Sequence, residues 1–306
     1  MKIYILTNTL YNLLINLILI GNNNDRCFLL SDNIEDIIRQ KISKKIYITE
    51  EGSRKIKNKF IKKIINLFLK IKIIVTYKKI ILNKNKIVYM QDHLLYSILA
   101  LNSKKYYLVE DGSLDYQRKK INKKINKIYL TGLAPIPKEI AHKTEIINLK
   151  ELWNKKALEE QNEILDIFSF DLNIKEKIKG RDIILFTQPL SEDNVITEEE
   201  KLEIYLEIIK KYPKERLVIK THPREKTNYK DIFKGYLVLD NPFPFEILNL
   251  LDIKFNKAIT LFSTAALGLG EEVEVDFYGT EIHPKIVKRF GSCNNIMERN
   301  CFLKEE

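Results

Sequence analysis

Apolar runs and amphipathic stretches alternate along the first half of the chain. Continuous apolar runs are typical of buried parallel strands, and helical patterns of about ten to fifteen residues between them indicate a doubly wound sheet. We therefore expect strands at Ile3–Thr7, Cys27–Leu30, Ile46–Thr49, Ile71–Val75, Ile87–Met90 and Tyr106–Val109. The stretches between them predict helices at Ile34–Ile42, Lys55–Lys70 and His93–Leu101.

The alternation loosens between Leu133 and Lys179 and then restarts. The second half predicts further strands at Asp182–Thr187, Leu217–Lys220, Leu237–Leu239, Ala258–Phe262 and Val273–Phe277. Single hydrophobic cores stop growing at roughly 250 to 300 residues, and this chain has 306. We therefore predict an α/β fold with two Rossmann-like domains, residues 1–155 and 156–306.

The helix that precedes Leu217–Lys220 is the best specified element of the sequence. Thr197 and Glu200 have the spacing of a capping box, and the acids of Glu198–Glu200 face the positive end of the helix dipole. A helix placed here makes Leu217–Lys220 the next buried strand. His222 then lies where that strand ends, and Pro223 biases its backbone towards an extended conformation.

Short polar motifs follow three of the predicted strands. Ligands of open α/β sheets bind outside the carboxyl ends of the strands, so these motifs are candidate site residues. They are Glu110-Asp111-Gly112, His222-Pro223 and Ser263-Thr264.

The residue types in these motifs suit transfer from an activated phosphate donor. The hydroxyls of Ser263 and Thr264, together with the free N–H groups of a helix start, can hold a phosphate, although an ordinary helix cap is the alternative. Glu246, at another predicted helix start, can accept hydrogen bonds from a ribose or simply match the helix dipole. A nearby phosphate would favour the charged form of His222, which could then act as an acid.

The general base is open between two places in the sequence. Glu110 and Asp111 are adjacent acids at a strand end, where mutual repulsion raises one pKa, and Gly112 permits a tight turn. Asp193, with Glu192 beside it, competes because its loop lies in the same domain as His222.

Composition and charge narrow the class of partner. The 52 Lys and Arg exceed the 41 Asp and Glu, and the formal charge of +11 suits an anionic partner. The lysines are dispersed and often alternate with Ile and Asn, as in Lys119–Lys127, so we expect solvated helix faces and no nucleic-acid partner.

The three cysteines lack metal-ligand spacing, which indicates reduced thiols and a cytoplasmic location. The apolar segment Leu10–Ile20 is too short to span a membrane, so we expect no anchor there.

Missing motifs exclude other kinds of site. There are only 10 Gly and no Gly-x-Gly-x-x-Gly fingerprint, which argues against a dinucleotide cofactor. No Asp-x-Asp pair is present to hold a divalent metal over a diphosphate. We expect a donor with one phosphate, no metal and no separate cofactor.

These motifs, in this order, resemble those of bacterial sialyltransferases. The sequence is most similar to glycosyltransferase family 52, the lipooligosaccharide sialyltransferases, which are related to bacterial polysialyltransferases. The resemblance extends over nearly the whole chain. It includes the opening strand and helix, the turn His222-Pro223-Arg224, the Pro-rich approach to Glu246, and Phe262–Leu267.

The resemblance implies a GT-B-like fold, in which two Rossmann-type domains face a central cleft. The first domain would hold the acceptor, a terminal galactoside of lipooligosaccharide or a related surface glycan. The second would bind the donor, CMP-sialic acid, for an inverting transfer that needs no metal.

The resemblance also assigns roles to residues. His222 would be the general acid, Ser263 and Thr264 would hold the phosphate, and Glu246 the ribose. Related sialyltransferase families imply Glu110 or Asp111 as the base, whereas family 52 implies an acid in the loop upstream of His222, which is Asp193 or its neighbour Glu192. Further substrate-binding positions are expected in the same motifs and loops at Gln188, Pro189, Gly112, Lys220 and Pro223.

Two other functions stay open. One is a glycosyltransferase that uses a different nucleotide sugar, either CMP-Kdo or a nucleotide-diphosphate sugar. The other is a basic protein without catalytic activity that binds nucleic acid or a membrane. The lysine-rich surface is compatible with peripheral contact with the anionic inner membrane, and a homodimer is an open alternative for the assembly.

Overall fold

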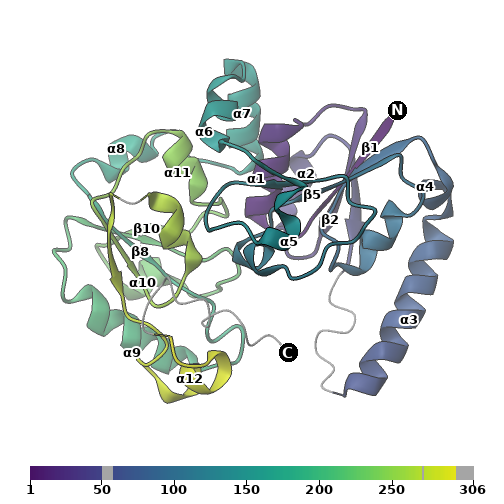
Figure 1. The fold of residues 1–306 in the computed structure, drawn as a ribbon. Coiled ribbons are helices and arrows are strands. Elements are labelled where there is room, and N and C mark those ends of the chain that lie inside the picture. Colours follow the sequence, from purple (N-terminus) through teal and green to yellow (C-terminus); the bar gives the residue numbers. More distant parts are fainter. Residues whose placement is uncertain (50–57, 271, 294–306) are drawn as a thin grey trace. The chain divides into compact units, whose positions relative to one another are not determined.

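The computed structural model describes residues 1–49, 58–270 and 272–293 (Figure 1). The chain divides into two compact units, Met1–Ser169 and Phe170–Glu306. The division lies later than the predicted boundary at residue 155, because helices α6 (Leu149–Asn154) and α7 (Leu158–Ile167) pack against α1 (Leu10–Leu19) of the first unit. The prediction of a fold with two Rossmann-like domains is confirmed.

The first unit contains a parallel sheet, whose order in the described residues is β3-β2-β1-β4-β5-β6-β7. Its strands are β1 (Lys2–Thr7), β2 (Arg26–Ser31), β3 (Lys45–Ile48), β4 (Lys86–Tyr89), β5 (Lys105–Val109), β6 (Lys127–Leu130) and β7 (Thr144–Ile146). Its other helices are α2 (Asp36–Lys41), α3 (Lys59–Thr76), α4 (Lys78–Leu82), α5 (Lys138–Ala141) and the 3₁₀ helices η2 (Leu95–Ala100) and η3 (Ser113–Gln117). The strand order reverses between β1 and β4, which is where a doubly wound sheet usually binds its ligand.

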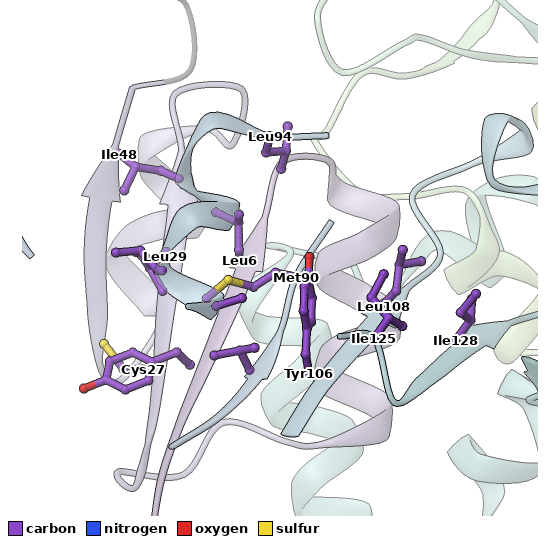
Figure 2. Packing of buried hydrophobic residues seen from close by; sticks show 14 of the residues in the cluster. Leu6, Cys27, Leu29, Ile48, Met90, Leu94, Tyr106, Leu108, Ile125 and Ile128 are labelled. Atoms are coloured by element: carbon purple, nitrogen blue, oxygen red, sulfur yellow. The ribbon is translucent and has the colours of Figure 1, made fainter. Parts of the chain in front are cut away.

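The core of the first unit is built from alternate residues of neighbouring strands. Figure 2 shows Leu6, Leu29, Leu108 and Ile128, each from a different strand, packed in one cluster with Met90. On another part of the sheet, α1 is buried along most of its length. The apolar segment Leu10–Ile20 is therefore a buried helix, as predicted, and in the described part of the chain no helix is long and apolar enough to cross a membrane.

Several predictions for the first unit are wrong in their detail. Ile71–Val75 is not a strand but the last turns of α3, because a short apolar run alone does not distinguish a strand from a helix. The helix predicted at Lys55–Lys70 begins at Lys59, where Asn58 caps it, and residues 55–57 lie outside the described residues. The segment His93–Leu101 forms the short helix η2 rather than an α-helix. Strands β6 and β7 were not predicted.

The second unit contains a parallel sheet with the order β10-β9-β8-β11-β12. Its strands are β8 (Ile183–Phe186), β9 (Leu217–Lys220), β10 (Leu237–Leu239), β11 (Lys257–Thr260) and β12 (Glu274–Phe277). Its helices are α8 (Ile174–Ile178), α9 (Glu198–Ile209), α10 (Tyr229–Ile232), α11 (Glu246–Leu250), α12 (Pro284–Phe290) and the 3₁₀ helix η4 (Thr264–Leu269). These strands confirm the alternation predicted for this half of the chain.

The helix α9 forms as its sequence predicts. Thr197 accepts a hydrogen bond from the backbone N–H of Glu200, and the Glu200 side chain accepts one from the backbone N–H of Thr197, which completes the capping box. Strands β8 and β9 are buried along their whole length, as expected for the centre of a parallel sheet. Of the cysteines, Cys27 is free and buried, whereas Cys293 is disulfide-bonded, so the prediction of reduced thiols is wrong for Cys293.

Candidate active site

The candidate donor site lies on the three central strands of the second unit. The strand order reverses between β8 and β11, and β9 is the other neighbour of β8. The loop that follows β8 begins with Thr187 and Gln188, the loop after β9 contains His222, and the loop after β11 contains Ser263. Two of the three predicted motifs, together with the predicted position Gln188, therefore emerge side by side from one edge of one sheet.

Gln188 joins the two loops that diverge at the reversal point. Its side-chain oxygen Oε1 accepts a hydrogen bond of 3.1 Å from the backbone N–H of Phe262. Its own backbone N–H donates to the hydroxyl of the buried Tyr205, at 2.7 Å. Pro189 is buried directly after it. The loop after β8 is thereby held to the loop that carries Ser263.

Ser263 caps the short helix η4. Its hydroxyl accepts a hydrogen bond of 3.3 Å from the N–H of Ala265, and its own N–H donates to the hydroxyl of Thr260, at 2.8 Å. Ser263 is half-buried. The side chain of Thr264 lies outside the described part of the structure. Ser263 therefore acts as a helix cap, the alternative named for this pair, and the phosphate-binding role of Ser263 and Thr264 stays a prediction.

His222 is half-buried in the turn after β9, and the turn fixes its tautomer. Its ring nitrogen Nδ1 accepts a hydrogen bond of 3.1 Å from the backbone N–H of Arg224, so a neutral ring carries its proton on Nε2. Burial, followed by the positive charges of Arg224 and Lys220, lowers the pKa of His222 to about 3. The imidazole is therefore neutral near pH 7 in the protein without ligand.

A buried carboxylate that the sequence analysis missed holds this turn. Glu225 accepts hydrogen bonds from the backbone N–H of His222 (2.8 Å), from the hydroxyl of Tyr229 (2.8 Å) and from the hydroxyl of Thr187 at the end of β8. Burial raises its pKa, and these hydrogen bonds together with the charge of Lys201 oppose the rise. Glu225 therefore ties the His222 turn to the neighbouring strand end.

Lys201 on α9 neutralises the acids around this turn. Its side chain has no exposed surface, and its ammonium nitrogen lies 3.0 Å from Glu192, 3.1 Å from Glu198 and 3.7 Å from Glu225. It also donates a hydrogen bond of 2.6 Å to the hydroxyl of Thr227. A single buried cation thus joins the loop after β8, the start of α9 and the turn after β9.

The structure separates the two acids in the loop after β8. Glu192 is nearly buried, and it binds Lys201 and accepts a hydrogen bond of 2.7 Å from the backbone N–H of Lys226. Asp193 is exposed, and its two oxygens receive the guanidinium of Arg224 at 2.6 and 3.1 Å. Of the pair, Asp193 is the carboxylate that a substrate can reach, and Arg224 holds it beside the His222 turn.

Lys220 ends β9, and Glu246 begins the helix α11 that follows β10. Lys220 is buried, and its ammonium donates to the backbone oxygens of Thr221 (2.9 Å) and Asn241 (3.4 Å) and lies 4.4 Å from the ring centre of Phe243. Lys220 therefore binds backbone at the ends of β9 and β10 and contributes positive charge near His222. Glu246 is half-buried at the first position of α11, where its charge matches the helix dipole.

In the first unit, the two acids of the motif Glu110-Asp111-Gly112 lie in different environments. Glu110 has no exposed surface and accepts hydrogen bonds from the hydroxyls of Tyr11 and Tyr116 and from the backbone N–H and hydroxyl of Thr131. Burial raises its pKa, and these hydrogen bonds oppose the rise. This geometry favours a structural role for Glu110, which joins the ends of β5 and β6.

Asp111 lies at the carboxyl edge of the same sheet with groups from two other strand ends. It accepts a hydrogen bond of 2.6 Å from the hydroxyl of Thr9 after β1, and its other oxygen lies 3.9 Å from Nε2 of His93 after β4. The backbone of Gly112 has φ of 143°, a conformation that favours glycine. Thr9 and His93 were missed as site residues, because neither stands in a motif and only the sheet order brings them to Asp111.

Acidic and histidine side chains do not gather into a metal site in the residues that the structure covers. There, no group of three His, Cys, Asp or Glu side chains is arranged to hold a metal ion. The carboxylates of the candidate site are instead paired with basic side chains or with hydrogen-bond donors.

Two Rossmann-like parallel sheets, with polar loops at the strand ends, are typical of the GT-B fold, and the family match identifies the chain as a glycosyltransferase. Residues 27–286 match glycosyltransferase family 52, and the chain belongs to this family. It is also similar to an uncharacterised protein of Haemophilus influenzae, with 45% identity over 222 residues, which cover 67% of this chain and 72% of the relative.

Solved structures of similar fold include two sialyltransferases. An α/β-galactoside α-2,3-sialyltransferase from Photobacterium phosphoreum has a TM-score of 0.57 at 15% identity, covering 98% of this chain and 97% of its own. A 2,6-sialyltransferase from Photobacterium sp. JT-ISH-224, solved with CMP and lactose, has a TM-score of 0.62 at 12% identity, covering 90% of this chain and 70% of its own. At these identities the likeness establishes the fold.

Proposed function

We propose that this enzyme is a sialyltransferase. It moves sialic acid from CMP-sialic acid to a terminal galactoside of lipooligosaccharide or a related surface glycan, with inversion and without a metal or separate cofactor. The observation that carries the proposal is the placement of Gln188, His222 and Ser263 on three adjacent strand ends of one sheet in a family 52 chain. The sialyltransferases of similar fold, one of them solved with CMP and lactose, support the choice of donor and acceptor.

On the donor side, each residue has a role that its chemistry supports. Ser263, Thr264 and the N–H groups at the start of η4 bind the single phosphate of the donor, and Glu246 accepts hydrogen bonds from the ribose. Gln188 and Pro189 shape the loop beside the phosphate. Lys220 and Pro223 hold the turn from which His222 reaches the same phosphate. A donor with one phosphate carries less charge than a diphosphate, so fixed donors can stabilise it without a metal.

The transfer breaks the bond between C2 of the sialic acid and the phosphate oxygen, and the acceptor hydroxyl oxygen forms the new bond at C2. The bonding electrons leave with the phosphate of CMP, and a base removes the hydroxyl proton. His222 acts on the departing oxygen through Nε2–H, the nitrogen that its turn leaves for a ligand. A phosphate monoester has a second pKa of about 6, so near pH 7 the departing group requires a strong hydrogen bond more than a full proton.

Two carboxylates are candidates for the base. Asp193 is exposed beside the His222 turn, and Asp111 lies with Thr9 and His93 in the first unit. Glu192 and Glu110 are less suitable, because both are committed to buried hydrogen bonds. Replacing each acid by its amide, with the donor and the acceptor varied in turn, identifies the base.

The test is the release of CMP from CMP-sialic acid, with and without lactose, in the presence of a chelator. We expect lactose to accelerate release and a sialylated product to form while the chelator has no effect. Release that requires added metal would refute the metal-independent mechanism. If no CMP is released and CMP gives no thermal shift, while CMP-Kdo or a nucleotide-diphosphate sugar protects the protein, the donor assignment is wrong.

We also expect the enzyme to work in the cytoplasm in peripheral contact with the inner membrane, where a lipid-linked acceptor would be presented. The formal charge of +11 supports contact with an anionic surface. Binding to RNA that weakens strongly with salt would favour the basic binding protein instead.

A further inference from the structure

Arg224 presents an accessible guanidinium on the turn that carries His222. Its terminal nitrogens Nη1 and Nη2 donate hydrogen bonds of 2.6 and 3.1 Å to the two carboxylate oxygens of Asp193. The side chain of Arg224 is 49% exposed, and that of Asp193 is 36% exposed. The pair therefore joins the loops after β8 and β9 and is still open to a ligand.

Asp193 uses only part of the donor capacity of this guanidinium. A guanidinium carries five N–H groups in a rigid plane, and the pair with Asp193 takes two of them. Among the described residues, the hydrogen bonds of the Arg224 side chain run to Asp193 alone. The remaining N–H groups, on Nε and on the outer sides of Nη1 and Nη2, can donate to a second carboxylate in the same planar, two-bond geometry.

The other cations near this turn are less suited to hold an anionic group of a donor. Lys201 has no exposed surface and is paired with three carboxylates. Lys220 is buried and donates to backbone oxygens. Lys226 is exposed, but an ammonium group is a point charge and lacks the fork that matches a carboxylate. Of these four cations, Arg224 is the one that is both accessible and shaped for a carboxylate.

The contacts of Arg224 place it beside the reacting atoms of the proposed transfer. Its backbone N–H donates to Nδ1 of His222 at 3.1 Å, and Nε2 of that ring acts on the departing phosphate oxygen in the proposed mechanism. After burial, the charge of Arg224 is the largest cause of the lowered pKa of His222, which also indicates a guanidinium near the ring.

The chemistry of the donor puts a carboxylate at the same place. In CMP-sialic acid the departing oxygen is bonded to C2, and C2 also bears the carboxylate. The carboxylate carbon is therefore only two bonds from the oxygen on which His222 acts.

We propose that Arg224 binds the carboxylate of the donor sugar and thereby sets the class of donor that the enzyme accepts. The assignment rests on the proposed function for its donor. One side of the guanidinium holds Asp193 and another holds the carboxylate next to C2, so that a single side chain places C2 beside Asp193. CMP-Kdo carries a carboxylate on the equivalent carbon and would be held in the same way, whereas a nucleotide-diphosphate hexose has no such group.

The test measures the affinity of the full chain for CMP, for CMP-sialic acid and for the C1 methyl ester of CMP-sialic acid, by calorimetry without an acceptor. Arg224→Gln should weaken the binding of CMP-sialic acid by about ten- to 100-fold, because a charge-assisted, two-bond contact is lost. The same substitution should change the affinities for CMP and for the methyl ester little, since neither has a charged carboxylate. Arg224→Lys keeps the charge without the fork and should fall between Arg224→Gln and the original chain.

Two control variants separate recognition of the carboxylate from general effects of charge and folding. Lys226→Gln removes an exposed cation from the same turn, and Asp193→Asn disrupts the ion pair but keeps the guanidinium. Both should bind CMP-sialic acid like the original chain. The thermal midpoints of Arg224→Gln and Asp193→Asn should agree, because both variants lose the same exposed pair.

The outcomes distinguish this assignment from the proposed function. Equal weakening of CMP and CMP-sialic acid in Arg224→Gln would overturn the assignment, as would a loss in Lys226→Gln or Asp193→Asn as large as that in Arg224→Gln. If the original chain transfers sialic acid to lactose and Arg224→Gln binds the donor unchanged, the role of Arg224 alone is wrong. If the original chain binds neither CMP nor CMP-sialic acid, the proposed function is refuted and the assignment with it.

Discussion

Replacing Lys201 by Met tests whether the buried lysine organises the donor loops. Methionine fills most of the space of the lysine stem but removes the charge that faces Glu192, Glu198 and Glu225. Removing one partner of a buried ion pair costs about 3–5 kcal/mol. Glu225 is 1% exposed and stays buried without its cation, whereas Glu198 is 41% exposed and can be resolvated, which lowers the cost. We therefore expect a loss of stability at the lower end of this range, about 3 kcal/mol.

This loss corresponds to a clear change in thermal midpoint. A domain of this size loses about 2–4 °C per kcal/mol, so the midpoint of the second unit should fall by roughly 6–12 °C. The matched control is Lys210→Met at the end of the same helix, where an exposed pair with Glu207 is worth at most about 1 kcal/mol. If the two variants unfold at the same temperature, the central role of Lys201 is refuted.

The pH dependence provides a second, independent readout. Burial raises the pKa values of Glu192 and Glu198, but their hydrogen bonds and the charge of Lys201 outweigh it, and both pKa values lie below the ordinary 4.5. Groups with lowered pKa values stabilise the fold above about pH 4.5, and this contribution is lost as the pH falls. The difference in free energy of unfolding between the original chain and Lys201→Met should therefore be largest at neutral pH and should shrink towards pH 4. A difference that grows on acidification would contradict the reasoning.

The remaining predictions concern the candidate active site. His222→Ala should lower turnover by about 10²- to 10⁴-fold. Because the pKa of His222 is about 3, kcat/KM of the original enzyme should show no histidine-linked change between about pH 5 and 8. A step near pH 6.5 that His222→Ala abolishes would show that the protonated ring is required. Asp193→Asn or Asp111→Asn should lower kcat by a similar factor with little change in KM for the donor, whichever is the base, while Glu192→Gln should mainly lower the thermal midpoint; full activity in both Asp variants would remove both candidates. Glu110→Gln should destabilise the first unit by about 1–3 kcal/mol, because an amide nitrogen replaces one oxygen that accepts buried hydrogen bonds, and chemical denaturation followed for the first unit measures it; a stable but inactive variant would instead make Glu110 catalytic.

Strand ends were predictable from the sequence because strands and turns are local. The apolar run Leu217–Lys220, the capping box at Thr197 and the turn at Pro223 each depend on a few neighbouring residues, and all three form as predicted. The prediction of a strand at Ile71–Val75 failed for the same reason. The local pattern suits a strand or a helix, and only packing against η2 decides between them.

The partners of the site residues were not predictable, because they come from distant parts of the chain. Lys201 resembles any other lysine of a surface helix in the sequence, and only the fold encloses it among three carboxylates. Likewise, the sequence gives no reason to prefer Asp111 to Glu110. The difference arises because Thr131 and two tyrosines from other elements enclose Glu110 and leave Asp111 at the edge of the sheet.

The three donor-side loops all extend from β9, β8 and β11, strands that have a hydrogen-bonded neighbour on each side. Strands in this position exchange their amide hydrogens mainly when the whole unit opens. Binding of a nucleotide by these loops should therefore stabilise the unit against global opening, and not only restrict the fluctuation of a single loop. Donor binding should slow exchange along Ile184, Val218 and Ile259, which lie inside the sheet and which no ligand would touch.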